Sequence, residues 1–260
     1  MSFRPAGFRS AVVRYAVVLV FALSSGAVLA QEAKAPAPAA TAAKPAAAAT
    51  APAETEAKPA EATAAVKPGD ATAGQGKAAA CGACHGMDGN STDPQYPKLA
   101  GQSEAYIARQ LTNFKSGKRQ NPIMMGMATP LSEQDMHDIG AYFASKSSLP
   151  GVADQALVER GEQLYRQGDT SKGVPACMAC HSIDGRGNPG AMYPQLTSQH
   201  AQYIEATLKA WHDGTVWGAD AHSQIMPGIA KKLDEKDIAA VASYVEGLHA
   251  AEGAGVSAAK

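Results

Sequence analysis

The pentapeptide Cys-x-x-Cys-His occurs twice in this sequence and constrains the fold more than any other feature. The copies run from Cys81 to His85 and from Cys177 to His181, and they contain every cysteine of the 260 residues. Two thiols at this spacing can add to the two vinyl groups of one porphyrin, and the next residue supplies an imidazole for the iron. The pattern predicts two covalently attached haem c groups, bound through Cys81, Cys84, Cys177 and Cys180.

Three other kinds of site also use paired cysteines. Two Cys-x-x-Cys pairs can bind a zinc ion, one pair can form a thioredoxin-like redox centre, and exported proteins often contain disulfides. None of these sites needs a histidine directly after the second cysteine, and both copies have one. Haem attachment is therefore the favoured interpretation.

The first thirty residues have the layout of a secretory signal peptide. Arg4, Arg9 and Arg14 precede an apolar run over 15–29, with a cleavage site after Ala30. An uncleaved anchor is the alternative, but about 15 apolar residues fall short of the roughly 20 that span a bilayer. We expect residues 1–30 to be removed and the mature protein to work in the periplasm. A retained segment would tether it peripherally to the membrane.

Residues 31–68 consist almost entirely of Ala, Pro, Lys, Glu and Thr, without an aromatic side chain. Such a segment buries too little apolar surface to offset its ordering entropy. It is predicted to be a disordered linker, and residues 251–260 are predicted to be a flexible tail.

The chain between these segments contains an internal repeat. Cys81 recurs as Cys177 after 96 residues, Tyr96-Pro97 as Tyr193-Pro194 after 97, and Met124 as Met226 after 102. Because the same signals recur in the same order, we predict two domains, 69–150 and 151–250.

Each repeat is predicted to be helical. Apolar residues fall on one face over 103–117 and 202–214, and both segments stop at a glycine. Capping signals open the last helix of each repeat, at Ser132 and at Asp234. Asp70 can cap a short helix before the first haem motif, and 153–166 takes that part in the second repeat. No alternating strand pattern occurs, so the fold class is all-α.

Iron that shuttles electrons needs a second axial ligand opposite its histidine, and methionine is a common one. Met226 lies in a Gly- and Pro-containing stretch, predicted to be a loop, before the last helix. Met124, Met125 and Met127 lie in the equivalent stretch, and Met124 matches Met226 in its distance to the next repeated leucine. The predicted axial pairs are His85 with Met124 and His181 with Met226, with Met127 as the substitute for Met124.

Two further groups of residues bear on these sites. Pro97 and Pro194 occupy equal positions in the repeat, so their carbonyls can accept a hydrogen bond from the iron-bound imidazoles. His222 is a competing ligand near Met226, but Gln120 stands at the equivalent position of the first repeat. His222 is therefore predicted to be a surface-loop histidine, and His200 to be solvated or structural.

The order of these signals resembles a class I cytochrome c domain, and the tandem arrangement resembles the dihaem cytochrome c4 family. The segment from Cys81 to Asn90, followed by 96–102, is especially similar, and the resemblance covers about residues 69–249. It implies two His/Met haems packed across a pseudo-twofold interface. It also implies a periplasmic carrier that takes electrons from a quinol-oxidising complex to a haem-copper terminal oxidase.

Two other classes of function remain open at this stage. A dihaem peroxidase or the haem subunit of a periplasmic dehydrogenase would also carry two haem motifs, and a haem-based sensor needs a vacant or weak sixth position. Both repeats here offer a methionine at the same place, which favours a carrier over an enzyme.

Charge excludes one further class. Residues 69–150 contain seven basic and seven acidic side chains, while 151–260 contain nine and thirteen. This asymmetry can orient docking to redox partners. No basic stripe is present, so nucleic acid is not a predicted partner.

Overall fold

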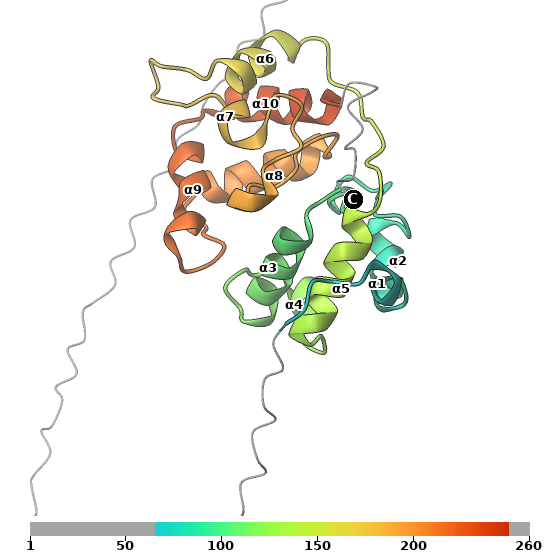
Figure 1. Ribbon diagram of the computed structural model, residues 1–260. Helices are drawn as coiled ribbons and strands as arrows, with labels where there is room; N and C mark the ends of the chain where they lie inside the picture. The colour runs from blue at the N-terminus through green and yellow to red at the C-terminus, as the bar shows by residue number, and fades with distance from the viewer. Residues whose placement is uncertain (1–65, 250–260) are drawn as a thin grey trace, which may run out of the picture. The chain divides into compact units, whose positions relative to one another are not determined.

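The computed structural model describes residues 66–249, which belong to a single unit of the chain (Figure 1). The predicted signal peptide, residues 31–65 of the predicted linker and the predicted tail lie outside the described residues. Between residues 66 and 249 the regular structure is helical, apart from two isolated β-bridges, Asp169 to Val174 and Asn188 to Tyr193. The all-α prediction is confirmed.

The first repeat forms five α-helices and one short 3-10 helix. They are α1 (Ala71–Lys77), η1 (Ala79–Cys81), α2 (Gly82–His85), α3 (Glu104–Lys115), α4 (Pro122–Ala128) and α5 (Glu133–Ala144). The Asp70 carboxylate accepts hydrogen bonds from two backbone N–H groups of α1, and Ser132 forms a reciprocal capping box with Asp135 at the start of α5. Both caps stand where the sequence predicts them.

The second repeat follows the same order. Its elements are α6 (Val158–Arg166), α7 (Met178–His181), η2 (Pro189–Ala191), α8 (Ala201–His212), η3 (Ala221–Gln224), α9 (Ile225–Ala230) and α10 (Glu235–Gly247). The predicted start of α6 at Ala153 is wrong. Asp154 instead closes a turn by accepting from the N–H groups of Ala156 and Leu157, so the helix begins at Val158.

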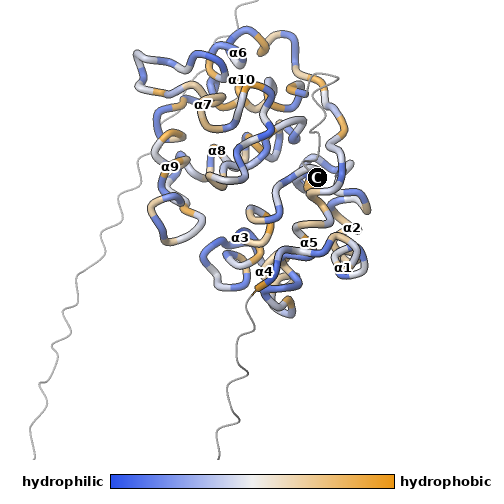
Figure 2. Tube along the Cα trace, in the orientation of Figure 1, coloured by the Kyte–Doolittle hydropathy of each residue, from blue (hydrophilic) through white to orange (hydrophobic). Residues whose placement is uncertain are grey.

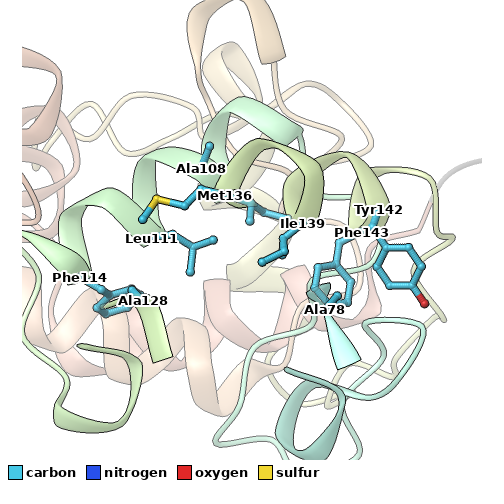
Figure 3. Packing of buried hydrophobic residues seen from close by; sticks show 10 residues of the cluster. Ala78, Ala108, Leu111, Phe114, Ala128, Met136, Ile139, Tyr142 and Phe143 are labelled. Atoms are coloured by element: carbon cyan, nitrogen blue, oxygen red, sulfur yellow. The ribbon is translucent and has the colours of Figure 1, made fainter. Parts of the chain in front are cut away.

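Each repeat has its own apolar core. In the first, α3 contributes Leu111 and Phe114, and α5 contributes Met136, Ile139 and Phe143, all under 8% exposed (Figure 3). Leu164 and Tyr165 of α6 are fully buried in the second core. Figure 2 shows that apolar stretches of the trace lie mainly in the helices, whereas the connections are largely hydrophilic. Burial of these helix faces stabilises each repeat.

The two methionine stretches are helical, which corrects the prediction of a loop. The Asn121 side chain accepts from the N–H of Met124 and caps α4, while Pro122 occupies the first turn. Met226 lies in α9. Proline suits the first turn of a helix because its missing N–H would have no helical partner there. The Asn-Pro pair therefore begins a helix at this position.

The two repeats contact each other through a reciprocal set of hydrogen bonds. The Gln102 side chain donates to the carbonyl of Gln195 (3.0 Å) and accepts from its N–H (3.0 Å). Gln199 makes the same two bonds to the backbone of Lys98, both at 2.9 Å. Positions 98 and 195, and likewise 102 and 199, are 97 residues apart. Equivalent residues thus form the same bonds in both directions.

Candidate functional site

A large, mostly apolar cavity of about 550 Å³ is lined by residues of both repeats. All four cysteines and the two motif histidines contribute to its walls. Apolar side chains from the two cores supply most of the remaining wall, among them Leu111, Phe114 and Leu208. A wide apolar space with a few polar groups is typical of a cofactor site.

The two histidines end the short helices α2 and α7 and are buried, with 6% of His85 and 5% of His181 exposed. His85 Nδ1 lies 2.8 Å from the carbonyl oxygen of Pro97, and His181 Nδ1 lies 2.9 Å from that of Pro194. A carbonyl can only accept, so each Nδ1 donates. The lone pair of each ring is then on Nε2, the atom left to bind a metal.

Burial affects the protonation of these groups. It lowers the pKa of His85 and of His181, although the hydrogen bond to the proline carbonyl acts in the opposite direction. Burial also raises the pKa of the Cys81 thiol, and it raises that of Cys177 to about 11. The imidazoles are therefore kept in the neutral form that can bind iron.

The alternatives for the cysteines can be tested against this geometry. None of the four forms a disulfide in the structure. Across residues 66–249, no group of three or more His, Cys, Asp or Glu side chains is arranged to hold a metal ion. The two cysteine pairs therefore do not form a shared zinc site.

Methionines from both repeats line the cavity. Met124 and Met127 of α4 contribute to its wall, as does Met226 of α9. Met124 and Met125 both pack against the first core, but Met125 does not line the cavity. The choice between Met124 and Met127 as an iron ligand stays a prediction, and so does the role of Met226.

His222 is not the surface-loop histidine that the sequence suggested. It lies in η3, lines the cavity and stacks on Tyr193, with ring centroids 5.4 Å apart. Its Nδ1 is 3.1 Å from an Arg109 nitrogen, and its Nε2 is 3.0 Å from the carbonyl oxygen of Ala191. Both ring nitrogens are thus engaged within the protein, which disfavours His222 as an iron ligand. His200, by contrast, is structural, because its Nε2 lies 2.9 Å from the carbonyl oxygen of Ser91 in the other repeat.

The donor set fits two covalent haems. Each repeat offers two thiols, a neutral buried imidazole and a methionine sulfur to an apolar space. A bound haem c supplies a one-electron Fe(III)/Fe(II) couple, whose potential depends on the axial ligands and on burial. The protein's own part is to bind the porphyrin, orient the imidazoles and exclude water.

Comparison with known proteins identifies the family. The sequence model of the family described as cytochrome c matches residues 71–147 and 158–249. A cytochrome c4 from Pseudomonas aeruginosa is 51% identical over 177 residues, which covers 68% of this chain and 88% of that protein. The chain belongs to the cytochrome c4 family. It therefore binds two covalent haem c groups and is a dihaem electron carrier rather than an enzyme.

This cytochrome c4 family member is also similar to a solved structure and to a second kind of electron-transfer protein. The crystal structure of reduced recombinant cytochrome c4 from Pseudomonas stutzeri shares 48% identity and superposes with a TM-score of 0.67, covering 70% of this chain and all of that one. A protein named thiosulfate dehydrogenase electron acceptor, from Thiomonas intermedia, is 38% identical over 173 residues, covering 65% of this chain and 78% of that protein.

Sequence reasoning missed the residues that join the two repeats. Gln102 and Gln199 carried a usable signal, because each follows a repeated leucine by three positions at the same offset of 97. Arg119 and Trp217 carried none, because neither has an equivalent in the other repeat. Their contact depends on how the two repeats pack.

Proposed function

We propose that this cytochrome c4 family member carries electrons in the periplasm from a quinol-oxidising complex to a haem-copper terminal oxidase. In this proposal His85 and Met124 are the axial ligands of one iron, and His181 and Met226 those of the other. The supporting observation is that both repeats present the same three kinds of ligating side chain, cysteine, histidine and methionine, to the cavity. The domain limits 69–150 and 151–250 belong to the same proposal.

The equivalence of the two sites favours a carrier over a dihaem peroxidase. A peroxidase needs one iron with an open or easily opened position, and a sensor needs a vacant or weak one. Here each repeat brings a methionine to the cavity wall, from α4 in one case and from α9 in the other. Two six-coordinate irons suit repeated one-electron exchange with protein partners.

A second candidate is electron acceptance from a periplasmic dehydrogenase. The relative named thiosulfate dehydrogenase electron acceptor supports it. Both candidates use the same two haem sites, and they differ only in the donor. A kinetic comparison of donors therefore separates them.

The periplasmic location rests on the N-terminal sequence, with cleavage after Ala30. In the part of the chain that the structure describes, no helix has the length and apolarity that a membrane span requires. Intact-mass analysis of protein purified from the periplasm tests the cleavage. A mass that still includes residues 1–30 would contradict it and support a retained anchor.

Near-infrared absorption tests the axial ligands. Methionine bound to ferric haem gives a weak charge-transfer band in the near-infrared. We therefore expect the oxidised wild type to show this band with the intensity of two haems. Met124→Ala and Met226→Ala should each remove about half of it. Met125→Ala is the matched control, because Met125 packs against the same core as Met124 but does not line the cavity. A loss in Met127→Ala instead of Met124→Ala would reassign the ligand, and a high-spin haem in the wild type would contradict the carrier proposal.

Stopped-flow spectroscopy tests the partners. We expect the reduced protein to be oxidised rapidly by a purified haem-copper oxidase, and the oxidised protein to be reduced by a quinol-oxidising complex supplied with quinol. Reduction by thiosulfate with a thiosulfate dehydrogenase, and not by the quinol-oxidising complex, would favour the second candidate.

A further inference from the structure

Arg119 is a buried cation at the contact between the two repeats. It follows α3 in the first repeat, is 9% exposed and lines the cavity. Its guanidinium donates to the Gln110 side chain and to the hydroxyl of Tyr203, both at 2.9 Å. The same group lies 3.4 Å from the ring centroid of Trp217 and 4.5 Å from that of Phe114. Tyr203 and Trp217 belong to the second repeat.

None of these partners carries a negative charge. Within residues 66–249, no ion pair includes Arg119. Arg109, which lines the same cavity, is paired with Asp220 at 2.9 Å, and Arg160 is paired with Asp169 at 2.7 Å. Aromatic faces and neutral oxygens orient a guanidinium, but they do not neutralise it. A buried charge normally has an opposite charge beside it.

The wall of the same cavity also holds a hydroxyl donor without a hydrogen-bond partner in the described part of the chain. Tyr106 of α3 is the repeat equivalent of Tyr203, and it lines the cavity. Its hydroxyl has no hydrogen-bond partner within residues 66–249. Burial raises the pKa of this hydroxyl, and the charges of Arg119 and Arg109 act in the opposite direction. Arg119 and Tyr106 thus bring a cation and a hydroxyl donor to the lining of an otherwise apolar cavity. This combination matches a carboxylate.

The cofactor brings carboxylates of its own, because each haem c carries two propionate groups. We propose that Arg119 binds a haem propionate in this cavity, and that Tyr203 and Trp217 of the second repeat hold its guanidinium in place. The positive charge of Arg119, in the first repeat, is then positioned by side chains of the second repeat. Trp217 lies between Gly214, which follows α8, and Met226. This segment is five residues longer than its equivalent in the first repeat, because the offset between the repeats rises from 97 to 102 across it.

The consequence is a contribution to the reduction potential. The ferric haem carries one more positive charge than the ferrous haem, so a nearby cation favours reduction. Removing Arg119 should therefore lower the potential of the haem whose propionate it binds. Arg109 should matter less, because Asp220 already balances its charge.

Spectroelectrochemical titration of the dihaem protein tests this. We expect Arg119→Gln to lower at least one potential by about 59 mV, which is a tenfold change in the equilibrium constant of a one-electron couple. Arg119→Lys should recover part of the loss, and Arg109→Gln should shift the potentials by less than half as much. Unchanged potentials in Arg119→Gln, or equal shifts in Arg119→Gln and Arg109→Gln, would overturn the proposal.

A second pair of variants covers the case in which Arg119→Gln does not assemble. Trp217→Ala keeps the cation but removes the ring that holds it, and Trp217→Phe keeps an aromatic face. A fall in potential in Trp217→Ala that Trp217→Phe reverses would support the proposal, and no difference between the two would contradict it. The methionine charge-transfer band should stay intact in all these variants. A failure here is therefore distinguishable from a failure of the axial assignment.

Discussion

The two haem motifs are followed by different residues at one backbone position. Gly86 and Ser182 each follow the motif histidine, and both have positive φ, 79° and 67°. Glycine adopts this conformation freely, whereas serine is strained in it because of its Cβ atom. The first repeat needs glycine for a further reason, since a Cβ at position 86 would lie 2.6 Å from the Asn90 carbonyl oxygen. The second repeat therefore stores strain beside His181.

Replacing Ser182 by glycine should release that strain. We expect Ser182→Gly to raise the free energy of unfolding by about 1 kcal/mol, because the relief exceeds the entropic cost of glycine and the loss of the Ser182–Asp184 hydrogen bond. Gly86→Ser is the opposite change at the matched position and should destabilise the protein by about 2 kcal/mol. Guanidinium unfolding followed by circular dichroism measures both. A less stable Ser182→Gly protein would show that the serine contacts outweigh the strain.

Residue-level prediction from sequence worked where the repeat supplied two copies of a signal. The equal positions of Pro97 and Pro194 predicted which carbonyls lie near the histidines, and the structure places both within 3 Å of Nδ1. It failed at His222, which has no counterpart in the first repeat. The contacts of His222 come from Arg109 and Ala191, and both are distant in sequence.

At the scale of whole elements, capping residues were a better guide to where helices start than glycine and proline were to where loops lie. Ser132 and Asp234 both cap helices as expected. The stretches around Met124 and Met226 contain Gly and Pro and still form α4 and α9. Short helices pinned by one cap and by core contacts have weak periodicity, because they are less than two turns long. Tertiary packing decides their structure.

The contact between α1 and α5 makes the stability of the first repeat depend on pH in the acid range. Asp138 of α5 is 3% exposed, accepts from the N–H of Asp70 at 2.9 Å and pairs with Lys77 at 2.5 Å. These contacts lower the pKa of Asp138 to about 2 from its ordinary value of 3.8. Since the pKa is lower in the folded state, ionised Asp138 stabilises the fold above about pH 4. That contribution is lost as the pH falls toward 2.

Asp138→Asn should remove this dependence. We expect the variant to be less stable than the wild type by about 2 kcal/mol at neutral pH, and the difference to shrink between about pH 4 and pH 2. Glu133→Gln removes a carboxylate from the first turn of the same helix, α5, and should leave the pH profile unchanged. Thermal unfolding from pH 2 to pH 7 measures this. Parallel profiles for the wild type and Asp138→Asn would contradict the assignment.

For the molecule as a whole, the sequence predicted two repeats but not how they join. The duplication is visible in the offsets of 96, 97 and 102 residues, and each repeat folds around its own helices. The junction includes Gln102 and Gln199, which bond to the backbone of the opposite repeat. The repeat marks these two glutamines as equivalent, but it does not show that their partners lie about 100 residues away in sequence. Only the packing of two finished folds brings these groups together.

Removing both glutamines should uncouple the repeats. Gln102 and Gln199 make four hydrogen bonds across the junction, and the N–H of Lys98 is left unpaired without them. At about 1 kcal/mol per bond, the double variant Gln102→Ala, Gln199→Ala should lose about 4 kcal/mol of coupling. We expect it to unfold in two separate calorimetric transitions that lie closer together, or merge, in the wild type. Gln134→Ala, which loses bonds to Lys67 and Asp138 but none across the junction, is the control. If the double variant melts as the control does, the junction is held by its other contacts, such as the Arg109–Asp220 ion pair and the apolar cavity wall, rather than by these four bonds.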